Sequence, residues 1–68
     1  MHDTLRALVE NGGNVEIGLE VPADLIKTLL SMANRTGAQI TIRASAYPVE
    51  TLLDLAREGR GNLTVRFD

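Results

Sequence analysis

The chain contains 68 residues, of which 44% are hydrophobic and 24% are charged; it has no cysteine, a single histidine and a net charge of −2. This composition is typical of a globular domain, and it excludes disulfide bonds, a thiolate or histidine metal cluster, and a strongly basic nucleic-acid-binding character. Because no stretch reaches about 20 apolar residues and no signal-peptide pattern is present, we expect a cytoplasmic protein without membrane contact.

The first two predicted elements are a helix and a strand. Residues 4–12 match a later helical segment, residues 51–59, in their leucines and terminal glycine, which predicts an N-terminal helix. From Val15 to Val21 apolar and polar residues then alternate, with Glu16, Gly18 and Glu20 on the polar side. This period of two predicts a half-buried strand.

A helix and a second strand follow. Between Pro22 and Thr36 the apolar residues fall within an arc of roughly 160°, a broad stripe suited to packing on a sheet. The second strand begins at Ile40, where Ile40, Ile42 and Ala44 alternate with Thr41, Arg43 and Ser45.

The last helix and strand repeat this pattern. A third helix is predicted from Pro48 to Glu58, and the third strand places Leu63, Val65 and Phe67 toward the core. Thr64 and Arg66 take the polar side of this strand. We expect Gly37 and Gly59 to end their helices, because glycine tolerates the left-handed conformation found there.

The chain repeats itself. Residues 28–43 align without a gap on residues 51–66 at an offset of 23, and six of the sixteen pairs are identical. The N-terminal segment is a degenerate third copy. Internal repetition predicts a single domain over residues 1–68, built as three helix-strand units in the order α-β-α-β-α-β.

The alternation of the strands predicts the layers of the fold. Strands separated by helices are joined by right-handed crossovers and therefore lie parallel. We predict an α/β fold with a three-stranded parallel sheet in the order 1-2-3, all helices on one face, and a polar open face. The competing order, with the first strand in the middle, would place helices on both faces and bury the polar positions. With strands in register at the 23-residue offset, the open face has one row of Gly18, Thr41 and Thr64 and a second row of Glu20, Arg43 and Arg66.

A strand followed by a helix in a repeat of this length, with the alternation seen from Leu63 to Phe67, resembles the leucine-rich-repeat solenoid. The resemblance covers most of the chain and concerns its architecture. The asparagine that usually follows the strand in that family is missing, since Ser45 and Ala46 follow the second strand. The resemblance implies a short solenoid of three units.

Few residues point to chemistry. Ser45 lacks a histidine to serve as its base, and Asp54 and Glu58 are carboxylates on an exposed helix face, so we expect no enzymatic activity. We also expect no catalytic, cofactor-binding or metal-binding residues. The edge where the strands end is a common ligand site in α/β folds, but Asp24 and Glu50 in the first helical turns would repel an anion.

The open face and the free strand edges have the best claim to function, because unprotected edges pair with other strands. We predict a small protein-interaction module that forms a homo-oligomer, a dimer, through its last strand or its open face, with a protein partner as a further possibility. The alternative is a small accessory domain that binds nucleic acid or another anion through the basic C-terminal half, a class that the composition disfavours. The candidate interaction residues are Glu16, Glu20, Thr41, Arg43, Thr64 and Arg66.

Overall fold

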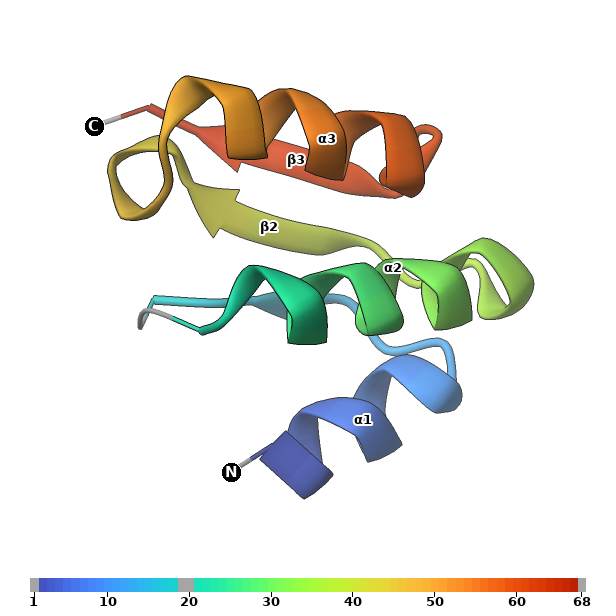
Figure 1. Ribbon diagram of the computed structural model, residues 1–68. Coiled ribbons are helices and arrows are strands. Elements are labelled where there is room, and N and C mark those ends of the chain that lie inside the picture. Colours follow the sequence, from blue (N-terminus) through green and yellow to red (C-terminus); the bar gives the residue numbers. More distant parts are fainter. Residues whose placement is uncertain (1, 19–20, 68) are drawn as a thin grey trace.

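The structure is a computed structural model that describes residues 2–18 and 21–67. Within these residues helices and strands alternate in the predicted order: α1 (His2–Glu10), β1 (Val15–Glu16), α2 (Ala23–Thr36), β2 (Ile40–Arg43), α3 (Val49–Gly59) and β3 (Leu63–Arg66) (Figure 1). A short 3-10 helix, η1 (Ala44–Ala46), lies between β2 and α3. None of the helices in the described ranges has the length and apolar character needed to cross a membrane.

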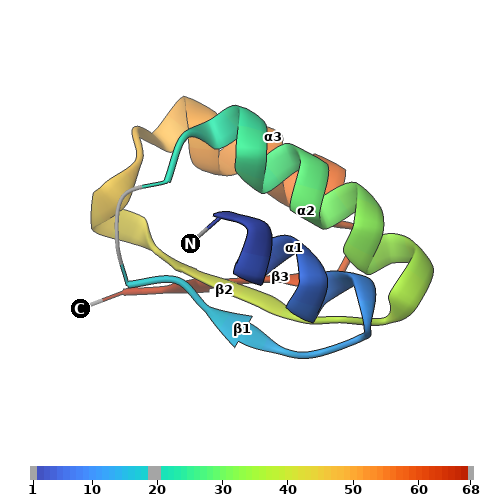
Figure 2. The same cartoon turned by 90° about the horizontal axis from the view of Figure 1, so that it is seen from below.

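The strands form one parallel sheet in the order β1-β2-β3, which confirms the predicted topology. All three helices lie on the same side of this sheet (Figure 2). Burial follows the layers, since Ile40 and Ile42 of β2 are buried toward the helices and Arg43 is exposed. The other face of the sheet is open and polar.

The register differs between the two strand pairs. β2 and β3 pair at the predicted offset of 23, with Ile40 opposite Leu63. β1 and β2 pair at an offset of 25, with Glu16 opposite Thr41. The predicted row that placed Gly18 beside Thr41 is therefore wrong. The physical reason is helix length: α2 has 14 residues and α3 has 11, so the crossover from β1 to β2 needs more chain.

All three strands are shorter than predicted, and β3 ends at Arg66, one residue before Phe67. β1 contains two residues, although the Ile17 amide still donates to the Thr41 carbonyl oxygen at 2.8 Å and continues the ladder beyond it. Residues 19 and 20, and with them the candidate Glu20, lie outside the described residues. β2 ends at Arg43, because the chain turns through η1 to rise from the sheet to the helical layer.

The two helix-ending glycines behave differently. Gly37 is the left-handed C-cap of α2, with φ 83°, as predicted. In α3 the left-handed C-cap is Arg60, with φ 47°, and Gly59 is the last helical residue. A Cβ at Gly59 would lie 2.7 Å from the Leu63 Cβ and 3.3 Å from the Leu30 Cδ2. Glycine is needed here for close packing rather than for its backbone conformation.

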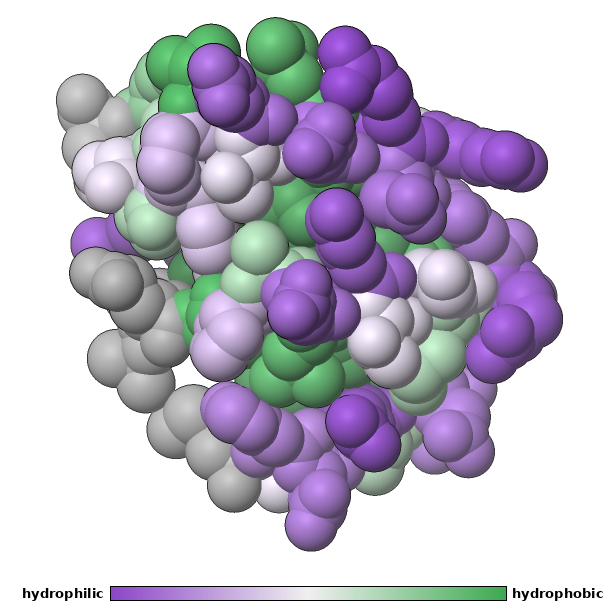
Figure 3. All heavy atoms as spheres, viewed as in Figure 1, coloured by the Kyte–Doolittle hydropathy of each residue, from purple (hydrophilic) through white to green (hydrophobic). Residues whose placement is uncertain are grey.

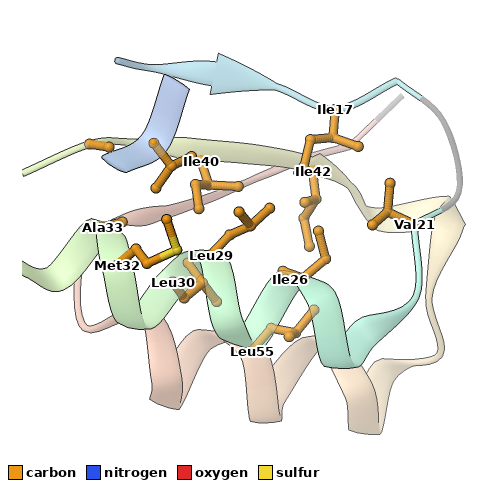
Figure 4. Packing of buried hydrophobic residues seen from close by; sticks show 12 residues of the cluster. Ile17, Val21, Ile26, Leu29, Leu30, Met32, Ala33, Ile40, Ile42 and Leu55 are labelled. Atoms are coloured by element: carbon orange, nitrogen blue, oxygen red, sulfur yellow. The ribbon is translucent and has the colours of Figure 1, made fainter. Parts of the chain in front are cut away.

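The hydrophobic core is centred on the middle unit (Figure 4). The outer helices each supply one fully buried side chain, Val9 from α1 and Leu55 from α3. In β3, Leu63 and Val65 are only partly buried against the cluster. The first and last helices and strands are thus covered on one side only. The middle unit supplies the buried residues Ile26, Leu29, Leu30, Met32 and Ala33 from α2 and Ile40 and Ile42 from β2.

Candidate interaction surface

Five of the six predicted interaction residues lie together on the open face of the sheet. Glu16, Thr41 and Thr64 are neighbours in one row across the three strands. Arg43 and Arg66 lie opposite each other in the next row of β2 and β3. All are exposed except Thr41, which is half-buried.

An ion pair crosses the open face. The Arg66 Nη1 lies 2.5 Å from the Glu16 Oε2, so the pair joins β3 to β1 over the middle strand. These side chains are 58% and 52% exposed, and an ion pair this open contributes at most about 1 kcal/mol. Arg43 forms no ion pair within the described part of the chain. The opposite charges of this face therefore meet within one chain, which leaves less complementarity for a second copy stacked on the open face than the sequence predicts.

The free edge of β3 ends in an exposed aromatic residue. β3 pairs with β2 on one side, and no described strand lies on its other side. The prediction that Phe67 faces the core is wrong, because its side chain is 80% exposed. The reason is the lack of cover at this end: β3 stops at Arg66, and Val49, the first residue of α3, is itself 71% exposed.

The outer side of α3 also exposes apolar residues. Leu53 is 52% exposed, and Ala56, one turn further along the helix, is exposed as well. In the space-filling view, hydrophobic residues gather along the upper margin, where Figure 1 places α3 (Figure 3). We call this surface the C-terminal edge; it comprises Val49, Leu53, Ala56, Phe67 and the free edge of β3.

The corresponding surface of α2 is fully covered. The α2 residues that precede Val49, Leu53 and Ala56 by the repeat offset of 23 are Ile26, Leu30 and Ala33. All three of these α2 residues are 0% exposed. α3 lies beside α2 in both ribbon views and approaches it closely through Gly59 (Figures 1 and 2). No further described helix lies over α3. Sequence reasoning missed these residues, although the alignment of Leu30 with Leu53 was a signal that could have found them.

Tyr47 and Asp54 have structural roles. The Tyr47 hydroxyl donates to the Val21 carbonyl oxygen at 2.5 Å and so holds the loop before α3 near the start of α2. Asp54 pairs with Arg57 at 2.9 Å on the exposed side of α3. In the described residues no polar or charged side chain is buried, and no three acidic, histidine or cysteine side chains gather as a metal site would require.

Comparisons with protein-family models, with curated proteins and with solved structures find no match to this chain. Function is therefore inferred from the geometry of the C-terminal edge.

Proposed function

We propose that this protein is a non-enzymatic interaction module that self-associates through the C-terminal edge. In this proposal the chain is a short array of three helix-strand units whose last unit lacks a covering neighbour. The observation that carries it is the contrast between Leu30, which is 0% exposed under α3, and its counterpart Leu53, which is 52% exposed. The same helix face is buried in the middle unit and open in the last one.

The physical chemistry of the C-terminal edge favours association. Full burial of a Val, Leu or Phe side chain contributes about 1.5–3 kcal/mol, and the partly exposed side chains here offer a fraction of that each. The free edge of β3 adds backbone groups that pair readily with another strand, and this strand contains no proline to prevent it. A domain of roughly 60 residues is marginally stable by itself, so a covering partner also adds stability.

Sedimentation velocity across a dilution series tests the proposal. We expect the wild-type chain to form oligomers that dissociate on dilution, and Leu53→Glu to be monomeric because a carboxylate cannot be buried unpaired in the contact. Ser31→Glu is the matched control, since it adds the same charge at an exposed position of α2. A wild-type chain that stays monomeric at every concentration, with unchanged stability, would remove the proposal.

A second candidate function is suggested by Arg43 and Arg66, which lie side by side on the open face. Two adjacent guanidinium groups form a small cationic site for a phosphate group, although Arg66 is already paired with Glu16. Titration with generic DNA or RNA at low salt separates the candidates. A nucleic-acid-binding domain would bind with a strong salt dependence, whereas the proposed module would show no binding.

A further inference from the structure

The two ends of the molecule expose different faces of the aligned helices. Leu55 of α3 is 0% exposed and belongs to the hydrophobic core, where it lies beside α2 (Figure 4). Its counterpart in α1, by the alignment of residues 4–12 with residues 51–59, is Leu8, which is 47% exposed. The aligned threonines show the same difference in exposure: Thr51 of α3 is half-buried, whereas Thr4 of α1 is exposed. α1 thus exposes residues equivalent to those that α3 buries beside α2.

The exposed faces of α1 and α3 match each other in the same way as the faces through which α2 and α3 pack within the chain. Within the chain, the α2 face containing Leu30 is covered by α3, which buries Leu55. At the C-terminal edge, Leu53 is the exposed counterpart of Leu30. On α1, Leu8 is the exposed counterpart of Leu55. One copy therefore carries both halves of the contact that joins its own units, at opposite ends of the array.

We propose that the C-terminal edge of one copy binds the N-terminal edge of a second copy, head to tail. The N-terminal edge comprises Thr4 and Leu8 of α1 and the free edge of β1. This inference rests on the proposed self-association and names the surface that covers the C-terminal edge. The second chain's α1 and β1 take the place of a fourth helix-strand unit.

The sheet supports the same arrangement. The rows inside the chain place Val15, Ile40 and Leu63 side by side, so a continued sheet sets Leu63 of one copy beside Val15 of the next. Glu16 of the second copy then lies on the strand next to β3, two residues out of register with Arg66. Such diagonal positions on neighbouring strands are roughly 7–8 Å apart, a distance that long side chains bridge. Within one chain the same two side chains already meet across two strand spacings. The charges of β1 and β3 are thus opposite and within reach.

A two-fold contact between two C-terminal edges lacks this complementarity. The charged residue of β3 is Arg66, and the described part of this strand has no carboxylate to face it from a second β3. A head-to-tail contact is heterologous and leaves one free edge at each end of the assembly. It therefore extends stepwise with concentration and does not stop at a dimer.

Mixing two blocked variants tests the direction of the contact. Leu53→Glu blocks the C-terminal edge and keeps the N-terminal edge, while Leu8→Glu does the reverse. We expect the wild-type chain to exceed dimer mass as concentration rises, and each variant alone to be monomeric. An equimolar mixture of the variants is expected to form a 1:1 heterodimer and nothing larger. Light scattering after size-exclusion chromatography measures these masses, with Ser31→Glu as the control for added charge.

The outcomes separate the two proposals. If Leu8→Glu self-associates as well as the wild type, the contact is two-fold through the C-terminal edge, and only the head-to-tail inference is overturned. If the wild type is monomeric throughout, self-association itself is wrong. Both leucines are about half exposed, at 47% and 52%, so the variants are expected to fold. Circular dichroism checks this, and Val49→Glu, at a position 71% exposed, replaces Leu53→Glu if that variant unfolds.

Discussion

The Thr36 hydroxyl donates a hydrogen bond to the Val9 carbonyl oxygen, 2.8 Å away, and so ties the last turn of α2 to the last turn of α1. On the other side of α2, the Asn34 Nδ2 donates to the Glu58 carbonyl oxygen of α3 at 3.0 Å. Helix C-terminal carbonyl groups lack partners within their own helix. α2 supplies a partner to one such carbonyl group of each neighbouring helix, so the three helices are joined by hydrogen bonds as well as by their apolar core.

Thr36→Val is expected to lower the free energy of unfolding by about 1 kcal/mol, because it removes this inter-helix bond and keeps the shape of the side chain. Urea denaturation measures the change. Thr28→Val is the control: its hydroxyl bonds to Asp24 within α2 at an exposed site, so the effect should stay within about 0.5 kcal/mol. Equal losses in the two variants would contradict a role for Thr36 in holding α1.

Gly59→Ala is expected to destabilise the chain by about 1–3 kcal/mol. Alanine normally stabilises a helix relative to glycine by about 1 kcal/mol, but here the new methyl group would meet Leu63 at 2.7 Å. Thermal unfolding followed by circular dichroism measures the result. Gly18→Ala has open space around the added Cβ and should be nearly neutral. A Gly59→Ala variant more stable than the wild type would show that α3 does not need this close approach.

Arg66→Glu distinguishes the edge from the open face as the contact. The substitution removes the exposed pair with Glu16, so we expect stability to fall by less than about 1 kcal/mol and association to weaken. Arg43→Glu leaves that pair intact and places a carboxylate opposite Arg66, so association through the C-terminal edge should persist. Dissociation constants from sedimentation equilibrium provide the comparison. If both variants weaken association equally, the contact lies on the open face and not at the C-terminal edge.

Leu55→Ala and Leu8→Ala test the difference between aligned positions. Leu55 is 0% exposed, and its truncation should cost about 2–5 kcal/mol. Leu8 is 47% exposed, so in dilute, monomeric samples we expect a loss of about 1 kcal/mol or less. Leu8→Ala should instead weaken association. Urea denaturation at low concentration checks the first result and sedimentation checks the second; similar stability losses would mean that Leu8 is already packed within its own chain.

The local pattern of the sequence was sufficient for the order of elements, the parallel sheet and the side of each strand that faces water. The alternation around Thr41 and Thr64 indicates which side chains point away from the core. The apolar stripe between Pro22 and Thr36 indicates a helix packed on one face of a sheet. These are properties of backbone geometry at periods of two and 3.6 residues, and they need no knowledge of distant contacts.

The tertiary structure decided the strand register and the burial of aligned residues, which the periodicity of the sequence does not determine. The additional length of α2 moved Glu16, rather than Gly18, beside Thr41 and allowed the ion pair with Arg66. The aligned leucines Leu30 and Leu53 have the same local pattern, yet one is buried and the other is half exposed. Burial depends on whether a neighbouring helix is present, and a repeat sequence is the same with or without that neighbour. The sequence by itself therefore determined the order of helices and strands, and only the tertiary structure decided which of their faces remain open.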